Sequence, residues 1–94
     1  MKKELVVANK TFKYFCIPTE KTNILIIQGS VGILSCAYIN INAANKLNEA
    51  VAIVTEVKNS EEMLSANIIE VSNRAKDLGI SVGMTGEEAL SLLG

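Results

Sequence analysis

The chain has no histidine and no tryptophan, and its 94 residues include one proline and two cysteines. The missing histidine excludes the cysteine–histidine pair that activates many catalytic thiols. Cys16 and Cys36 lack the C-x-x-C spacing of metal-binding loops, so we expect no metal site and no cofactor. Glu4 and Lys10 interrupt any apolar signal segment, and two cysteines without such a signal predict reduced thiols in the cytoplasm.

Charged residues are missing from residues 22–45, although they make up 20% of the chain. So long an uncharged stretch must be hidden in a membrane, a sheet core or a subunit interface. A membrane-spanning helix needs about 20 consecutive apolar residues. Here Gln-Gly-Ser at 28–30, a cluster of turn-forming residues, divides the stretch into two short runs rich in Ile and Val. Because β-branched residues favour strands, we predict a buried hairpin and no membrane segment.

The net charge of −1 argues against a strongly electrostatic partner, so we expect no nucleic acid. Lysines and aromatic residues interleave over residues 10–15, as they do in strands that bind nucleic acid. An edge strand protected by lysine explains the same pattern and is preferred. The chain is also 49% hydrophobic, which is more apolar surface than a small core readily hides. We therefore expect a homo-oligomer.

Strands are expected mainly in the first half and helices in the second, the α+β pattern of a single domain over residues 1–94. The expected elements of the antiparallel or mixed sheet are strands at about 4–8, 11–17, 23–28, 31–39 and 50–54, packed by helices at about 42–48, 60–65, 68–78 and 86–93. Asn40 or Asn42 is expected to cap the first helix, and Asn59 or Ser60 the second. Gly79 suits a helix C-terminus, and Thr85 with Glu88 forms a capping box for the last helix.

Several segments carry a family resemblance in the same order and spacing: residues 34–40, 52–58, 62–64, 78–80 and 83–90. They are similar to the YunC-like family of small bacterial and archaeal domains of unknown function. The resemblance covers about residues 23–93, and the Gly-Met-Thr-Gly at 83–86 is its most specific part. It implies an α+β domain whose amino-terminal β region takes part in forming a tetramer. This chain has Ala37 and Glu56 where many members have glycine.

Cys36 is the one weak candidate for a catalytic residue. On an alternating strand it shares a face with Leu34 and Tyr38. As a nucleophile it would need a basic neighbour such as Lys58 or Arg74, or a helix N-terminus, to stabilise its thiolate. A small buried strand residue is the simpler interpretation. We therefore assign no catalytic residue, and whether the protein is an enzyme stays open.

Asn40, Thr55 and Lys58 are polar residues at the ends of expected elements, where loops often carry binding sites. They are predicted to line a pocket for a small ligand, an anion if Lys58 supplies the counter-charge and the helix starting at Ser60 its N–H groups. Ordinary capping and turn roles explain the same residues.

Three classes of function remain open: a small-ligand-binding or regulatory module with its pocket at subunit contacts, a thiol-dependent enzyme using Cys36, and a structural or adaptor oligomer. We prefer the first, because polar residues gather at element ends while the thiol lacks a base.

Overall fold

Six strands form one mixed sheet in the spatial order β1-β2-β3-β4-β5-β6. The computed structural model describes residues 2–94. The strands are β1 (Lys2–Val7), β2 (Lys10–Pro18), β3 (Asn23–Gln28), β4 (Gly32–Cys36), β5 (Ala50–Val54) and β6 (Glu70–Val71). The helices are α1 (Ile41–Lys46), α2 (Ser60–Ser65), α3 (Asn73–Asp77) and α4 (Gly86–Leu93). The expected α+β class, with most strands in the N-terminal half, is confirmed.

Neighbouring strands are antiparallel except for β4 and β5, which run parallel and are joined by α1. Parallel strands need a crossover connection, and a short helix supplies it here. Asn40 caps α1 by accepting a hydrogen bond from the backbone N–H of Asn42 at 2.8 Å. The two strands therefore end at the same edge of the sheet, which positions the loops that follow Cys36 and Val54 side by side.

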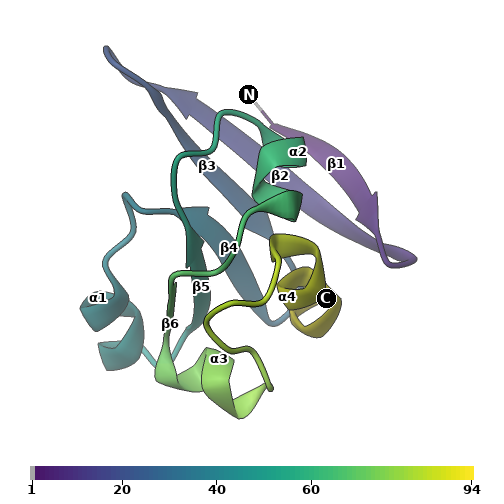
Figure 1. Cartoon of the computed structure of the whole chain (residues 1–94), viewed down its shortest axis with the longest axis vertical. Helices are drawn as coiled ribbons and strands as arrows, with labels where there is room; N and C mark the ends of the chain where they lie inside the picture. The colour runs from purple at the N-terminus through teal and green to yellow at the C-terminus, as the bar shows by residue number, and fades with distance from the viewer. Residues whose placement is uncertain (1) are drawn as a thin grey trace.

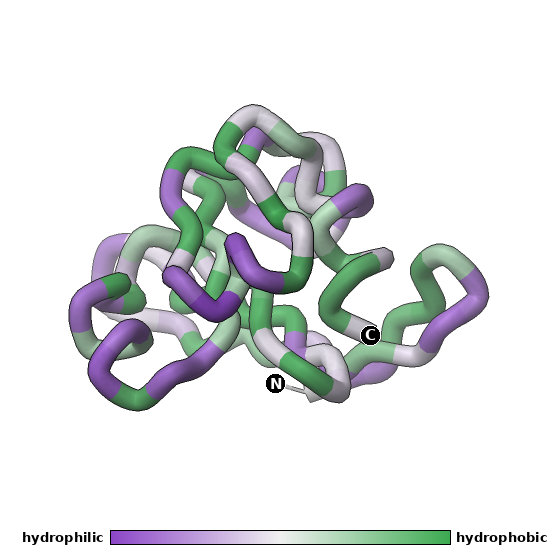
Figure 2. The backbone as a smooth tube through the Cα atoms, turned by 90° about the horizontal axis from the view of Figure 1, so that it is seen from below, coloured by the Kyte–Doolittle hydropathy of each residue, from purple (hydrophilic) through white to green (hydrophobic). Residues whose placement is uncertain are grey.

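Two hydrophobic clusters lie on opposite faces of the sheet. The larger cluster joins alternate residues of β2 to β5, such as Leu25, Ile27 and Leu34, to α2, α3 and α4. The smaller one joins Ala44 of α1 to Val51 and Ile53 of β5. Figure 1 shows α2 and α4 in front of the sheet and α1 at its lower left. Figure 2 shows hydrophobic and hydrophilic residues alternating along much of the chain, with strongly hydrophilic residues in several outer loops.

The predicted hairpin within residues 22–45 is confirmed as β3 and β4, which pair in the register Ile27↔Leu34. Leu25, Ile27 and Leu34 have no exposed surface, because they face the larger cluster. Ile26 points to the other face, since side chains alternate along a strand, and it is only half-buried. No helix in residues 2–94 is long and apolar enough to cross a membrane.

The single helix predicted over residues 68–78 is wrong. Residues 70–71 are extended as β6, and α3 begins only at Asn73. The extended backbone pairs with β5, where the N–H of Ile69 donates to the carbonyl of Ile53 at 2.8 Å. The buried Ser72 hydroxyl then caps α3 and also accepts from the N–H of Val51 at 2.9 Å. The hydrogen bonds that residues 69–72 make to β5 therefore favour an extended backbone here, although the apolar residues have helical spacing.

The strand predicted over residues 31–39 is also too long, because β4 ends at Cys36. The chain turns there, and the N–H of Ile39 donates to the carbonyl of Cys36 at 3.3 Å. Tyr38 consequently leaves the sheet and is 57% exposed. The shared strand face expected for Cys36 and Tyr38 does not form.

In the Gly-Met-Thr-Gly segment that leads into α4, the backbone conformation and close packing explain the choice of residues. Gly83 has φ of 100°, in the region that favours glycine. The Met84 carbonyl accepts from the N–H of Ile68 at 2.7 Å, and Thr85 forms the expected capping box with Glu88. At Gly86 the helix start lies so close to the carbonyl of Met63 in α2 that no Cβ fits there.

Candidate functional site

A pocket of about 360 Å³ opens at the carboxyl ends of the parallel strands β4 and β5. In α/β units this is the edge where ligands usually bind, because the loops that leave adjacent parallel strands diverge there. The pocket is lined by Thr22, Asn23, Cys36, Ala37, Tyr38, Thr55, Glu56 and Val57. Three segments contribute: the turn after β4, the segment after β5, and the start of β3, which runs antiparallel to β4.

Four polar side chains of the lining are not committed to the fold. Within the part of the chain that the structure describes, the side chains of Thr22, Asn23, Tyr38 and Thr55 make no hydrogen bond to protein. Each carries groups that both donate and accept hydrogen bonds. A bound molecule would therefore find hydrogen-bonding partners here without breaking any internal contact of the domain.

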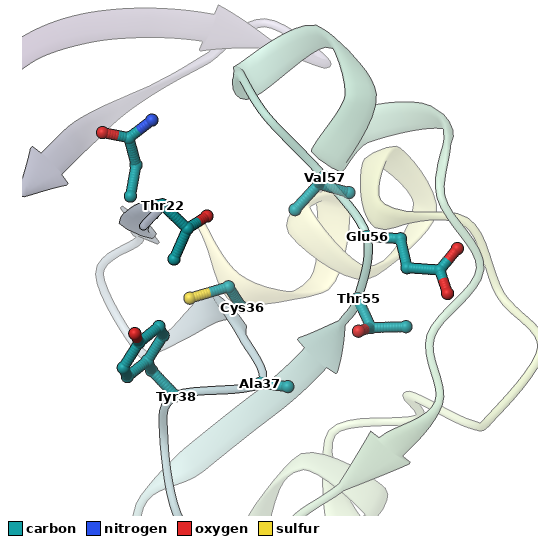
Figure 3. Close-up of a pocket in the computed structure, with 8 residues that line it drawn as sticks. Thr22, Cys36, Ala37, Tyr38, Thr55, Glu56 and Val57 are labelled. Carbon is teal, nitrogen blue, oxygen red and sulfur yellow. The ribbon is translucent and has the colours of Figure 1, made fainter. Parts of the chain in front are cut away.

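Cys36 lines the same pocket but is held by the sheet. Its Sγ accepts a hydrogen bond from the backbone N–H of Leu25 at 3.4 Å, and the residue is 8% exposed. In Figure 3 the sulfur points toward the space between Thr22 and Tyr38. The pocket lining holds no lysine, arginine or histidine that would act as a base for the thiol. The geometry thus places Cys36 in the pocket wall, largely buried and without the partner that a nucleophile needs.

The two cysteines are not joined by a disulfide. Cys16 on β2 is paired with Leu25 of β3. The backbone N–H of Leu25 donates a hydrogen bond to the Sγ atom of Cys36 on β4, the strand on the other side of β3. The cysteines therefore lie two strands apart, roughly 10 Å between Cα atoms at the usual strand spacing. A disulfide needs less than about 7 Å, so the sheet itself prevents their pairing.

Of the residues singled out from the sequence, Cys36 and Thr55 are brought together in the pocket. Asn40 and Lys58 do not line it. The Asn40 amide oxygen is occupied as the cap of α1. The backbone N–H of Lys58 donates to the Glu62 carboxylate at 2.7 Å, at the exposed start of α2. The predicted arrangement of an anion beside Lys58 therefore has no counterpart in this pocket.

Glu56 occupies an unusual backbone conformation at the pocket rim. Its φ is 59°, in the left-handed region that glycine adopts without strain. Many members of the resembling family have glycine at this position, and the backbone alone explains that choice. A close approach of backbone to ligand is not required for it. In Figure 3 the Glu56 carboxylate extends away from the space that Thr22, Cys36 and Val57 surround.

Sequence reasoning missed Thr22, Asn23 and Tyr38. Thr22 directly precedes β3 and Asn23 is its first residue, so their role depends on the antiparallel pairing of β3 with β4. One available signal was the helix expected between two buried strands, since a strand–helix–strand unit implies a parallel pair and a ligand site at its carboxyl edge.

In residues 2–94 no three His, Cys, Asp or Glu side chains gather as a metal site. The fold and the pocket define a small α+β domain with a βαβ unit and, at the carboxyl edge of that unit, a pocket whose one charged lining residue is Glu56.

The chain belongs to the family described as "Domain of unknown function (DUF1805)", whose profile matches residues 35–93. It is 29% identical over 90 residues to the uncharacterized protein YunC of Bacillus subtilis, covering 92% of this chain and 89% of that protein. The crystal structure of a protein of unknown function, TA1206 of Thermoplasma acidophilum, superposes with a TM-score of 0.95 at 29% identity. That match covers all of this chain and 92% of the other. The YunC-like resemblance is confirmed.

Proposed function

We propose that this protein is a small-molecule-binding domain that acts as a cytoplasmic homo-oligomer. The observation that carries the binding role is the pocket at the carboxyl ends of β4 and β5, where four polar side chains have no partner within the described chain. A volume of about 360 Å³ is in the range of small-ligand sites. Thr55 belongs to this binding set, and Thr22, Asn23 and Tyr38 complete it.

Self-association is supported by the sheet face opposite α2 and α4. On β2 and β3 this face presents Phe15, Ile17, Ile24 and Ile26, and none of them belongs to either core cluster. Ile17 is 52% exposed. Phe15, Ile24 and Ile26 are half-buried, so all four side chains keep some apolar surface accessible on this face. Contiguous accessible apolar surface usually marks an interface. We propose that a second copy covers it, and that the tetramer implied by the family resemblance is the assembly.

The cytoplasmic location is supported by the composition: Cys16 and Cys36 are not joined by a disulfide, whereas small secreted domains usually depend on disulfides for stability. A thiol-dependent reaction remains the second candidate function, because Cys36 lines the pocket. It is ranked below binding since no basic side chain lines the pocket beside the thiol.

Native mass spectrometry of gently purified protein tests the proposal. We expect a multiple of the 10.1 kDa chain that carries the extra mass of a retained small molecule. Ala37→Leu places a larger side chain in the pocket and should abolish the extra mass. Ala43→Leu, on the exposed side of α1 and outside the pocket, is the matched control and should retain it. An oligomer that never carries extra mass contradicts the binding role and favours a structural or adaptor protein. A monomer contradicts the assembly.

A further inference from the structure

We infer that the pocket takes an uncharged ligand that bears a carboxamide or hydroxyl group, and that it discriminates against carboxylates, phosphates and amines. This inference rests on the proposed binding function and specifies the chemistry of the same site.

The first argument is the charge of the lining. Glu56 is the only Asp, Glu, Lys or Arg among the eight lining residues, and it is exposed. Its carboxylate extends away from the space beside Cys36 (Figure 3). Lys21 and Lys58 adjoin lining residues in sequence but do not line the pocket, and Lys21 lies 3.8 Å from Glu20 on the surface. A charged ligand group would thus lose water without gaining a counter-charge, which is unfavourable.

The second argument is the type of hydrogen-bonding group. The hydroxyls of Thr22, Tyr38 and Thr55 and the amide of Asn23 each offer both donors and acceptors. A carboxylate presents only acceptors and an ammonium group only donors, so either would leave part of this capacity unpaired. A primary carboxamide presents both, and a hydroxyl does the same. The lining therefore matches neutral groups of mixed polarity.

The third argument concerns the rest of the ligand. Ala37, Val57 and the ring of Tyr38 supply apolar surface to the pocket. In Figure 3 the Val57 side chain points into the space opposite Tyr38. An apolar or aromatic body would be covered by these groups while its polar end meets the threonines. Small-ligand sites commonly combine an apolar lining with a few polar groups that fix orientation.

The test uses benzamide, benzoate and benzylamine, which share size and shape and differ in charge. Each is titrated into 15N-labelled protein, and amide chemical shifts of the lining residues are followed by NMR. We expect benzamide to bind about tenfold more tightly than either charged probe. Its shifts should disappear in Ala37→Leu and persist in Ala43→Leu.

The outcomes separate the ligand chemistry from the proposed function. Tighter binding of benzoate or benzylamine at the lining residues, or equal affinity for all three probes, overturns the inference and leaves a binding pocket in place. If none of the three probes shifts the lining residues, the inference is overturned, and the extra mass sought by native mass spectrometry decides separately whether the binding function stands.

Discussion

The Sγ atom of Cys36 accepts a hydrogen bond from the backbone N–H of Leu25 at 3.4 Å. This contact extends the β3–β4 pairing through a side chain, and it accompanies an exposure of only 8% for the cysteine. The thiol is thus part of the sheet as well as part of the pocket wall. The reactivity of this thiol distinguishes the two leading candidate functions, ligand binding and a thiol-dependent reaction.

Alkylation by iodoacetamide measures that chemistry in the variant Cys16→Ser, where Cys36 is the only thiol. We expect native Cys36 to react at least about tenfold more slowly than in concentrated urea, because it is buried and has no basic neighbour in the pocket lining. The reciprocal variant Cys36→Ser reports the behaviour of Cys16 as a control. A native rate above the unfolded rate would show an activated thiol and move the protein toward the enzymatic alternative.

Ile26→Asp tests the proposed subunit interface. Ile26 belongs to neither core cluster, and its side chain lies on the sheet face opposite Leu25 and Ile27. A carboxylate buried between subunits should weaken association by at least about 2 kcal/mol, roughly 30-fold, while the monomer stays folded. Light scattering over a concentration series gives the assembly state and circular dichroism the fold. Leu47→Asp, at an exposed position beyond α1, should leave assembly unchanged.

An unchanged assembly in Ile26→Asp would place the interface elsewhere. Ile33→Asp then provides a second probe, because Ile33 packs beside the small cluster of α1 and β5. A charge at that position is expected either to dissociate the oligomer or to prevent soluble expression. If both variants are folded and fully assembled, the proposed interface is refuted.

Tyr14 predicts a pH dependence of stability at alkaline pH. Burial raises the pKa of the Tyr14 phenol, and the nearby Cys16 raises this pKa further through its charge and a hydrogen bond. The folded state therefore holds the phenolic proton more tightly than the unfolded state. This contribution is complete below the ordinary pKa of tyrosine and is lost as pH rises through the folded pKa.

The variant Tyr14→Phe has no proton to lose at this position. Urea denaturation at neutral and strongly alkaline pH should show a smaller loss of stability for Tyr14→Phe than for the parent. Lys3 lies 5.8 Å from the Tyr14 ring centroid, and phenylalanine keeps an aromatic ring for it to contact in the variant. Equal losses in the two proteins would mean that Tyr14 makes no such contribution.

Gly86→Ala tests the contact between α2 and α4. In an exposed helix, replacing glycine by alanine stabilises by up to about 1 kcal/mol. Here the added methyl group would meet the carbonyl of Met63, so we expect a loss of about 1–3 kcal/mol in the free energy of unfolding. Glu87→Ala, on the exposed side of the same turn, is the control and should cost less than about 1 kcal/mol. Stabilisation by Gly86→Ala would refute the close contact.

Local rules predicted most of the elements. The caps at Asn40, Asn59 and Thr85 and the turn at Gly79 depend on neighbouring residues only, and each is present in the structure. The β-branched runs likewise located the central hairpin. Residues 68–71 were assigned to a helix because Ile68 and Val71 are spaced as on one face of a helix. That spacing alone does not exclude an extended segment. Only the pairing partner, β5, decides between the two.

The candidate site was predictable only in part, for a similar reason. Cys36 ends β4 and Thr55 directly follows β5, the parallel neighbour of β4. Thr55 was found from its position at an element end, whereas Cys36 was singled out for its thiol. Thr22 and Asn23 join them through the antiparallel register of β3, which no local pattern reveals. Tyr38 reaches the pocket because the chain turns at Cys36, and that turn is fixed by one backbone hydrogen bond from Ile39.

The segment 83–86 carries a consequence for comparing sequences. Gly83 is required by a left-handed backbone, Thr85 by a capping box and Gly86 by the carbonyl of Met63. The pocket, in contrast, is lined entirely by residues between Thr22 and Val57. The Gly-Met-Thr-Gly segment, the most recognisable signature of these chains, therefore reflects the requirements of the fold. Two proteins that share it share an architecture, and whether they share a ligand is decided by side chains elsewhere.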